Sequence, residues 1–454
     1  MNLLTFHSTN GQAPPVNLRE ALLAGQAPDR GLYLPSEFPR LAPAELAAFA
    51  RLPYPEIAAR VLAPYTAGIL PRADLEALCA DAYNFEVPLE PVAGRQRVFV
   101  LRLDRGPTAS FKDFAARFMA RLLGRFVRES GRPLTILTAT SGDTGSAVAH
   151  AFHGVEGIRV IVLFPEAEVS PRQRKLMTVL RGNVRCAAVR GKFDDCQALV
   201  KRAFADPALR DLPLSSANSI NIGRLLPQCV YYFYAAARVA APGEPVVFSV
   251  PSGNFGDMMG AVLARRMGLP VRRLVVAVNE NDAFPRFLAS GRYQKIEPSR
   301  NCLSNAMNVG HPSNLARLVA VYGGHLDEAG VLHRPPDLAA LRRDLFSPSV
   351  SDARTRAAMR AAWTQHRLLL EPHGAVGWQG LLDYEAVEPL DGTPAVVLET
   401  AHPAKFPDEV RQVLGLEPDV PPAIARAEQA PEDYDRLEPD YAAFRDYLRA
   451  GHER

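Results

Sequence analysis

The sequence predicts an α/β fold in which helices cover both faces of a largely parallel sheet. From about residue 98, short β-branched runs alternate with segments whose apolar residues recur at helical spacing. Such βαβα order builds parallel sheets, because each helix crosses back over the sheet. The chain also has 454 residues, 48% of them hydrophobic, which is enough for two or three domains.

Each expected element follows from its own run of residues. The expected strands are short apolar runs at 98–103, 134–138, 160–164, 184–189, 246–250, 274–278 and 395–398. The expected helices have a periodic apolar face and cover 111–128, 144–153, 193–205, 222–239 and 257–267. A further helix begins after Ser170-Pro171, because serine suits the N-cap and proline the first turn.

These elements divide the chain into four expected regions. Residues 1–95 are Pro-rich, with helical patches and no series of strands, which indicates a separate, mainly helical N-terminal region. Two α/β domains are expected at 96–240 and 241–415. Residues 416–454 are acid-rich and dotted with proline, and we expect a C-terminal surface segment there that closes with a helix at 441–448.

Charge and cysteine usage exclude several classes of function. The net charge of +3 is small for this length, so neither nucleic acid nor an anionic membrane is an expected partner. The five cysteines form no CxxC pair, so we expect no disulfide framework and no metal site. No leader-like segment and no run of 18 apolar residues is present, and the cytoplasm is the expected compartment.

Lys112 has an unusual position at the start of an expected helix. Ser110 and Asp113 have the spacing of a capping box, which predicts that the helix begins at Ser110. The first turn of a helix carries the positive end of its dipole, so a lysine there has a lowered pKa. The neutral amine that results is the form needed for a Schiff base. Taken alone, a surface lysine that covers apolar neighbours is the simpler interpretation.

Two loops that follow expected strands have the composition of anion sites. Residues 139–146 (ATSGDTGS) and 251–257 (PSGNFGD) each lead from a strand into a helix. Hydroxyls and free backbone N–H groups converge at such helix starts. The second loop is neither a Walker A motif nor a complete GxGxxG fingerprint. The alternative for both loops is a capped turn without a ligand.

Other polar and aromatic residues have simpler interpretations. His150 and His153 have a metal-compatible helical spacing, but without a third ligand we expect packing. For His402 a structural hydrogen bond competes with a catalytic role. The aromatic run 231–234 is expected to be helix core.

Taken together, segments along almost the whole chain resemble motifs of the threonine synthase family, which belongs to the fold-type-II pyridoxal-phosphate enzymes. In chain order they are 27–35 (APDRGLYLP), 106–114 (GPTASFKDF), 140–145 (TSGDTG), 191–197 (GKFDDCQ), 218–221 (NSIN) with Arg224 and 227–228 (PQ), 252–257 (SGNFGD), 312–314 (PSN) and 400–406 (TAHPAKF). Each motif alone is weak, but the ordered set is specific. The resemblance implies a fold like that of the tryptophan synthase β chain, with two open, twisted, mostly parallel sheets.

The resemblance implies pyridoxal 5'-phosphate as cofactor and assigns residues to it. Lys112, in the 96–240 domain, would form the covalent bond to the cofactor. Thr400 would bind the pyridine nitrogen, and as a hydroxyl it does not force that nitrogen to be protonated. The cofactor phosphate would rest on the loop of the 241–415 domain formed by Gly253, Asn254, Phe255 and Gly256.

The resemblance also implies conversion of O-phospho-L-homoserine and water to L-threonine and phosphate, with Lys112 moving protons. Asp143 would lie beside the cofactor's phenolic oxygen, close to the substrate. The substrate carboxylate would be bound by Ser141, Gly142 and Thr144. The substrate phosphate needs charge-assisted donors, and the candidates are Asn221, Arg224 and Lys405.

Three positions depart from the family pattern, and two other functions remain open. Arg105 and Asn308 stand where a histidine and an aspartate are common, and Arg30 replaces a usual glycine. A phospholyase would use the same lysine and cofactor but release a keto acid and ammonia. A non-catalytic α/β nucleotide-binding protein is the alternative outside enzymes. A monomer and a homodimer are both compatible with the sequence.

Overall fold

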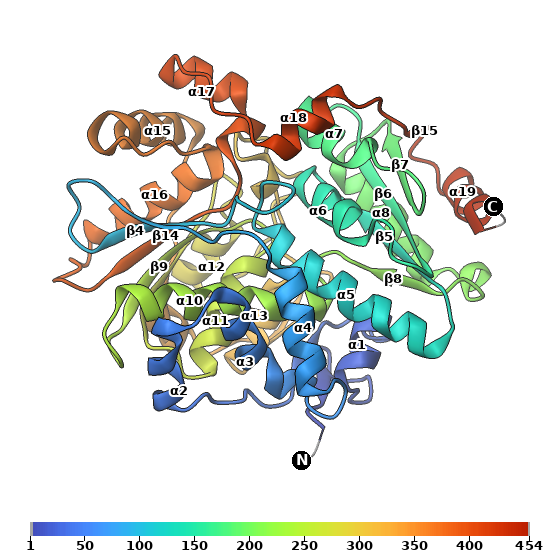
Figure 1. The fold of residues 1–454 in the computed structure, drawn as a ribbon, viewed down its shortest axis with the longest axis horizontal. Coiled ribbons are helices and arrows are strands. Elements are labelled where there is room, and N and C mark those ends of the chain that lie inside the picture. The colour runs from blue at the N-terminus through green and yellow to red at the C-terminus, as the bar shows by residue number, and fades with distance from the viewer. Residues whose placement is uncertain (1–2, 453–454) are drawn as a thin grey trace.

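Two parallel sheets form the centre of the protein, which we describe over residues 3–452 from a computed structural model. Figure 1 shows the two sheets side by side. The larger sheet has the order β13 (Leu345–Phe346), β10 (Val271–Ala277), β9 (Val246–Pro251), β14 (Ala395–Glu399), β4 (Val98–Arg102) and β3 (Leu89–Pro91). The smaller sheet has the order β15 (Asp435–Leu437), β7 (Val184–Val189), β6 (Ile158–Pro165), β5 (Leu134–Ala139) and β8 (Leu214–Ser216). Among these pairings only that of β3 with β4 is antiparallel.

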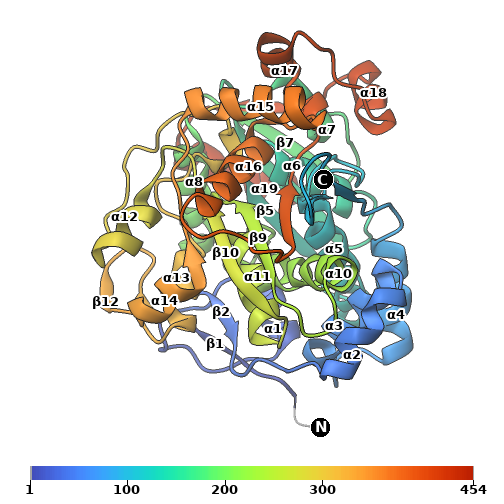
Figure 2. The same ribbon diagram turned by 90° about the vertical axis from the view of Figure 1, so that its left-hand side faces the viewer.

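Helices surround both sheets. The first half of the chain contributes α1 (Leu18–Ala24), α2 (Pro43–Ala48), α3 (Tyr54–Thr66), α4 (Arg72–Ala82), α5 (Lys112–Ser130), α6 (Asp143–Phe152), α7 (Pro171–Thr178), α8 (Phe193–Ala205), α9 (Ile222–Leu225) and α10 (Val230–Val239). The second half contributes α11 (Gly256–Arg266), α12 (Ala283–Ser290), α13 (Leu315–Val321), α14 (Leu338–Asp344), α15 (Asp352–His366), α16 (Pro372–Glu385), α17 (Pro407–Leu414), α18 (Pro422–Gln429) and α19 (Tyr441–His452). Figure 2 shows α16 and α11 on opposite sides of β9 and β10.

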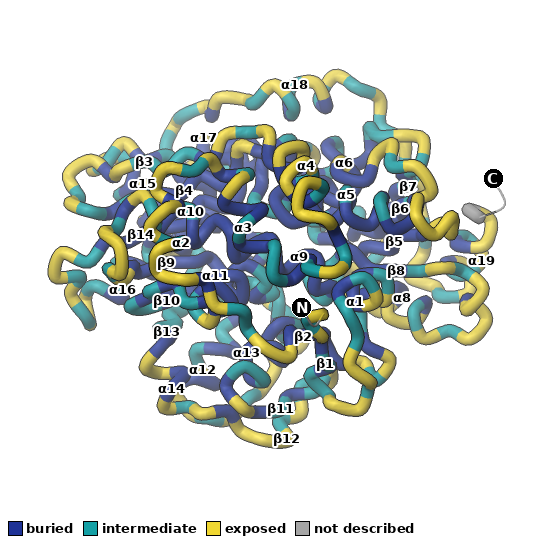
Figure 3. Tube along the Cα trace, turned by 60° about the horizontal axis from the view of Figure 1, so that its bottom comes forward, coloured by how far each residue is buried: buried dark blue, intermediate teal, exposed yellow. Residues whose placement is uncertain are grey.

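Alternation of side chains along the strands explains this sandwich. Successive residues of a strand point to opposite faces. In β9, Val247 packs in the cluster that contains Trp378 of α16, whereas Phe248 packs in the cluster that contains Met258 of α11. Figure 3 shows the central strands of both sheets as buried, and exposure is concentrated on the outer loops and terminal helices. Strands buried on both faces read as nearly continuous apolar runs, which is why the sequence reveals them.

The helix that carries Lys112 begins without the predicted capping box. Helix α5 starts at Lys112, and Phe111 is its N-cap. The Asp113 carboxylate instead accepts hydrogen bonds from the backbone N–H and the hydroxyl of Thr108, at 2.8 and 2.7 Å. For the Asp113 carboxylate, these two donors from the preceding turn replace the single Ser110 N–H that a capping box would supply. The Ser110 hydroxyl has no hydrogen-bond partner among the described residues.

Two further local predictions are corrected. The helix expected at 222–239 consists of α9, a 3₁₀ turn over Leu226–Cys229, and α10, because Pro227 lacks the backbone N–H that a continuous α-helix needs. The N-terminal region contains an antiparallel pair, β1 (Phe6–Ser8) and β2 (Tyr33–Pro35), besides its helices. A second small pair, β11 (His325–Leu326) and β12 (Leu332–Arg334), lies outside the main sheets.

The sheets do not follow the predicted domain boundaries. Strand β4 was expected in the 96–240 domain, yet it pairs with β14 in the larger sheet. The 416–454 segment supplies β15 to the smaller sheet, and Phe444 and Leu448 of α19 are buried. Pairing across long sequence separations leaves no local signal, so the boundaries could not be placed from order alone. Within residues 3–452, no helix is long and apolar enough to cross a membrane.

Candidate active site

A cavity lies at the carboxyl ends of strands from both sheets. It measures about 970 Å³ including its open mouth. Loops that follow β5, β9 and β14 contribute Thr140, Ser252 and Thr400, and the start of α5 contributes Lys112. The carboxyl edge of parallel strands is where α/β proteins bind ligands. The fold therefore brings the two predicted anion loops and the predicted lysine to one space.

The loop after β9 is built for close approach of an anion. A Cβ at Gly253 would lie 2.7 Å from Met307 Cα and 2.8 Å from the Ala306 carbonyl oxygen, so only glycine fits. Phe255 has a φ of 63°, a left-handed conformation that turns the chain into α11. The first N–H groups of α11 have no partners within the helix, and they lie at the positive end of the helix dipole.

Asn254 supports this loop through its side chain. Its amide donates to the Ser219 hydroxyl at 2.7 Å, and its carbonyl accepts from the Ser313 N–H at 2.5 Å. The side chain therefore holds the loop in place, and the backbone N–H of Asn254 adds a donor that an anion can use. Gly256 also lines the cavity, and a Cβ there would meet Ser219 Cβ at 3.5 Å and Gln228 Nε2 at 3.7 Å, which are ordinary contact distances.

A buried carboxyl group lies behind the same loop. Asp257 accepts hydrogen bonds from the hydroxyls of Tyr231 and Tyr232, at 2.6 Å each, through one oxygen. Its other oxygen is buried without a partner among the described residues. Burial raises the pKa of Asp257 to about 6, which the tyrosine hydroxyls and Lys112 oppose. The predicted helix-core role of the tyrosines is confirmed, and both also orient this acid.

Lys112 is largely removed from water. Its ammonium lies 3.7 Å from a carboxylate oxygen of Asp143 and 4.6 Å from the centre of the Phe111 ring. Burial lowers the pKa of Lys112; Asp143 opposes this shift, whereas Lys405 and Arg224 add to it. The direction agrees with the prediction from the helix dipole, but desolvation is the larger cause. The neutral amine is thereby favoured.

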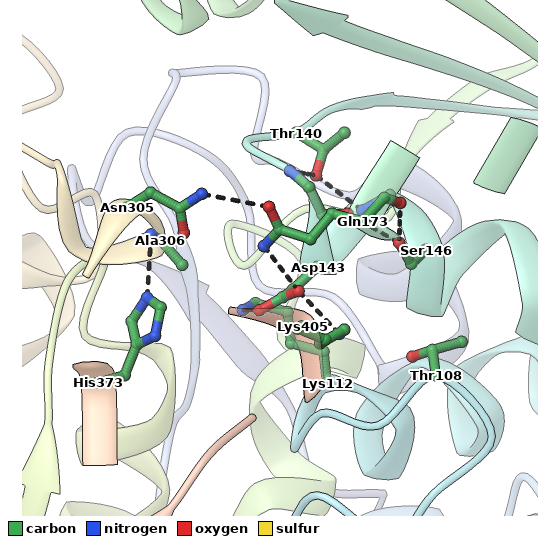
Figure 4. Close-up of polar contacts among 12 residues, drawn as sticks. Thr108, Lys112, Thr140, Asp143, Ser146, Gln173, Asn305, Ala306, His373 and Lys405 are labelled. Atoms are coloured by element: carbon green, nitrogen blue, oxygen red, sulfur yellow. Dashed lines mark hydrogen bonds and ion pairs between the residues drawn. The ribbon is translucent and has the colours of Figure 1, made fainter. Parts of the chain in front are cut away.

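Asp143 lies at the centre of a buried polar network, which Figure 4 shows. One of its oxygens accepts hydrogen bonds from the Lys405 ammonium at 2.8 Å and from the Gln173 amide at 3.0 Å. Burial alone would raise the pKa of Asp143, but Lys405 and Lys112 together hold it well below its ordinary value. Asp143 is therefore ionised at neutral pH.

The loop after β5 is closed by its own side chains. The Thr140 hydroxyl accepts hydrogen bonds from the N–H groups of Gly142 and Gly145, at 2.9 and 2.7 Å. Gly142 has a φ of 128°, and a Cβ there would lie 2.7 Å from the Gln173 side chain. Ser141 and Thr144 line the cavity. Gly142 itself does not, so its role is to shape the turn.

The three expected ligands of a substrate phosphate separate in the structure. Arg224 lines the cavity; its guanidinium donates to the Ala217 carbonyl at 2.5 Å, and its Nε has no partner among the described residues. Burial lowers the pKa of Arg224 to about 10, so it remains charged at neutral pH. Asn221 is turned away: its amide donates to the carbonyls of Leu22 and Ser216, at 2.9 and 2.8 Å. Lys405 is fully buried and paired with Asp143.

The structural reason for both corrections is local. Asn221 caps α9 by accepting from the Gly223 N–H at 2.9 Å, so its whole amide is committed to the backbone. The Lys405 ammonium lies within hydrogen-bond distance of the Asp143 carboxylate. The sequence does not reveal this contact, because the two residues are far apart along the chain. Of the three candidates, only Arg224 is placed to meet an anion in the cavity.

Sequence reasoning missed two parts of the site. Gln173 contacts the Asp143 carboxylate, and its side chain also accepts from the Asn305 amide at 3.2 Å. His373 lines the cavity; its Nε2 accepts from the Ala306 N–H at 3.1 Å, and its Nδ1 donates to Glu371 at 2.6 Å. Ser170 and Gln173 form a capping box at the start of α7, but nothing local in the sequence indicates that Gln173 also reaches Asp143.

Thr400 and His402 lie in the same segment but have different contacts. Thr400 lines the cavity, and its carbonyl accepts from the Phe111 N–H at 2.9 Å, which joins β14 to the start of α5. His402 Nδ1 accepts from the Ala404 N–H at 3.1 Å, and burial lowers the pKa of His402 to about 4. The structural hydrogen bond is therefore the role that the geometry supports for His402.

One group of metal-type side chains comes together outside the cavity lining. Potential ligand atoms of Glu280, Cys302 and Asp352 lie within 4.8 Å of one another. Burial raises the pKa of the Cys302 thiol to about 11, and a protonated thiol is not the form that binds a metal. We therefore assign no metal to this group.

Comparison with known proteins agrees with this site. Models of three protein families match the chain: a pyridoxal-phosphate-dependent enzyme family over residues 86–400, the threonine synthase N terminus over 5–83, and the threonine synthase C-terminal region over 374–448. The threonine synthase of Haemophilus influenzae is 40% identical over 451 residues, which is 99% of each chain. That of Escherichia coli is 38% identical over 98% of each chain.

Solved structures give the same result. The crystal structure of threonine synthase from Escherichia coli superposes with a TM-score of 0.88 at 37% identity, over 98% of this chain and 100% of that one. The pyridoxal-phosphate-bound threonine synthase from Brucella melitensis superposes with a TM-score of 0.90 at 37% identity, over 99% of each chain. The predicted fold class is confirmed, and a non-catalytic nucleotide-binding protein is excluded. The chain belongs to the threonine synthase family of pyridoxal-phosphate-dependent lyases.

Proposed function

We propose that this enzyme converts O-phospho-L-homoserine and water to L-threonine and phosphate. The observation that carries the proposal is one cavity that joins a buried lysine, whose pKa is lowered by burial, to two separate anion-binding regions. Lys112, the start of α11 and the buried Arg224 all line this cavity. A cofactor phosphate and a substrate phosphate need two such regions.

The residues present fit pyridoxal phosphate. Gly253 keeps open the cradle that a Cβ would close, and we assign the cofactor phosphate to the N–H groups of Gly253, Asn254, Phe255 and Gly256. Lys112 supplies the amine for the covalent bond, and the Thr400 hydroxyl is the partner of the pyridine nitrogen. When bound, the cofactor supplies an electron sink for carbanion chemistry.

The protein's own groups would bind the substrate and move its protons. Ser141 and Thr144, in the loop shaped by Gly142, would bind the substrate carboxylate through hydroxyls and N–H groups. The unpartnered Nε of Arg224 would meet the substrate phosphate, whose leaving charge needs a cation. Lys112, favoured as a neutral amine, would remove the Cα proton and return protons later in the cycle.

We also assign a compartment and consider the oligomeric state. The five cysteines are free and buried, which fits a reducing compartment, and we assign the enzyme to the cytoplasm. A monomer and a homodimer are both compatible with this assignment.

The decisive experiment is product analysis on O-phospho-L-homoserine. The purified enzyme should show a visible cofactor band, release phosphate, and form L-threonine in equal amount. A phospholyase would release phosphate with a keto acid and ammonia, and threonine would be absent. Phosphate release without threonine would therefore contradict the proposal and favour that alternative.

A further inference from the structure

One buried carboxylate stands between two lysines at the centre of the site (Figure 4). The Asp143 carboxylate is hydrogen-bonded to the Lys405 ammonium at 2.8 Å through one oxygen, and its other oxygen lies 3.7 Å from the Lys112 ammonium. Asp143 and Lys405 are 2% and 0% exposed, so water screens neither charge. The two lysines therefore share one counter-charge, and Lys405 holds the closer position.

Removal of the Lys405 charge would change this balance. A buried carboxylate binds the nearest cation, because an unpaired charge is costly away from water. Without Lys405 that cation is Lys112, and the contact would hold a proton on its nitrogen. An opposite charge within 4–6 Å typically shifts a pKa by about 1–3 units. With Lys405 in place, the pair is close to neutral and leaves Lys112 free to lose its proton.

The other groups near Lys112 do not replace Lys405. Glu371, at the N-cap of α16, opposes the lowering of the Lys112 pKa, and Arg224 of α9 adds to it. Asp257 of α11 interacts with Lys112, and His373 of α16 interacts with Asp143. Among the described residues, only Lys405 forms an ion pair with Asp143 at hydrogen-bond distance. Gln173 binds the same oxygen but carries no charge.

We propose that Lys405 is a positioning residue of this active site, whose buried ammonium holds the Asp143 carboxylate and so leaves the Lys112 nitrogen able to release its proton. This role replaces the contact with the substrate phosphate that the sequence suggested. Lys405 acts through Asp143 and touches no reacting atom. The inference rests on the proposed function only for its kinetic readout.

The test is Lys405→Met in the cofactor-loaded enzyme. The pH midpoint of the visible absorbance band, which reports protonation of the Lys112 nitrogen, should rise by at least about one unit. The acid limb of the kcat profile should move with it, so that kcat at pH values below the midpoint falls about tenfold per unit. KM for O-phospho-L-homoserine should change less than threefold. The absorbance midpoint keeps its meaning even if another substrate proves to be correct.

Three variants separate charge from packing. Lys405→Gln keeps a donor for Asp143 without the charge and should shift the midpoint as Met does. Lys405→Met combined with Asp143→Asn removes both charges and should return the midpoint most of the way to wild type. Lys175→Met is the matched control, because among the described residues the Lys175 ammonium donates only to the carbonyls of Glu428 and Ala430, at 2.5 and 3.4 Å; its midpoint should not move.

Two results would overturn the proposal. The first is an unchanged midpoint in both Lys405 variants, provided that thermal unfolding shows them to be folded. The second is an unchanged midpoint together with a tenfold rise in KM, which would make Lys405 a substrate ligand. If Lys405→Met does not fold, Lys405→Gln and the double variant carry the test.

Discussion

The cradle at Gly253 permits a quantitative prediction. In Gly253→Ala the new Cβ would lie 2.7 Å from Met307 Cα, whereas carbon atoms pack at about 3.5 Å or more. The loop or its neighbour must therefore move by about 0.8 Å, the difference between these two distances. Both obstructing atoms belong to the backbone of residues 306–307, so a rotamer change cannot relieve the contact.

This displacement should weaken cofactor binding strongly. Overpacking of this kind costs about 1–3 kcal/mol, and the same shift lengthens hydrogen bonds to the phosphate, which are worth about 1.5–3 kcal/mol each when charged. Since about 1.4 kcal/mol is a factor of ten, we expect the Kd for pyridoxal phosphate to rise about ten- to a hundredfold. Titration of cofactor-depleted protein, followed by the visible absorbance band, measures this constant.

Gly256→Ala makes the same chemical change in the same loop and serves as the comparison. Its Cβ would meet Ser219 Cβ at 3.5 Å and Gln228 Nε2 at 3.7 Å, both ordinary contact distances, so we expect a loss of affinity below tenfold. Equal losses in both variants would show that the loop tolerates no side chain anywhere, and the argument from the Met307 contact would fail. Wild-type affinity in Gly253→Ala would refute the reasoning outright.

Three other predictions concern single side chains. Lys112→Ala should lose the visible band that depends on the covalent bond, and all turnover; threonine formation by this variant would refute the assignment. The fold raises the pKa of Asp257 from an ordinary 3.8 to about 6, because burial favours the protonated carboxyl. The resulting contribution to stability is fully present below pH 3.8 and is lost as the pH rises through 6. The shift of about 2 units corresponds to roughly 3 kcal/mol at about 1.36 kcal/mol per unit. When the pH rises from 5 to 8, the melting temperature of Asp257→Asn should therefore fall less than that of the wild type. Equal falls in the two proteins would contradict this account. The buried Arg317 guanidinium donates to the carbonyls of Tyr33, Ser219 and Ile220. Arg317→Met should cost about 2–4 kcal/mol, read as a lowered melting temperature; an unchanged value would contradict it.

Much of the fold could be read from the sequence, because its signals are local. Strands buried on both faces leave continuous apolar runs, and the observed β5, β7 and β9 match the expected runs within one residue at each end. The N-cap at Ser170 is confirmed for the same reason, since its side chain accepts a hydrogen bond within the first turn of α7. The ordered motifs likewise predicted that Lys112 and the loops after β5 and β9 belong to one site.

Other local expectations failed where a competing partner came from nearby in space. Asp113 binds Thr108 in place of the Ser110 N–H, because the turn at residues 106–108 folds back against it. The Asn221 side chain accepts a hydrogen bond at the start of α9 and donates to the carbonyls of Leu22 and Ser216. In each case the residue type was read correctly as a polar side chain that makes hydrogen bonds, but the folded geometry selected a different partner.

The sequence alone determined the fold class, the family and the positions of the lysine and the anion loops, since these depend on periodicity and short motifs. Only the tertiary structure decided which charges meet. Lys405 and Asp143 are 262 residues apart, and β4 pairs with β14 across nearly 300 residues. Contacts of this kind are fixed by how the two sheets pack together, and burial then sets their electrostatic strength, which no local pattern records.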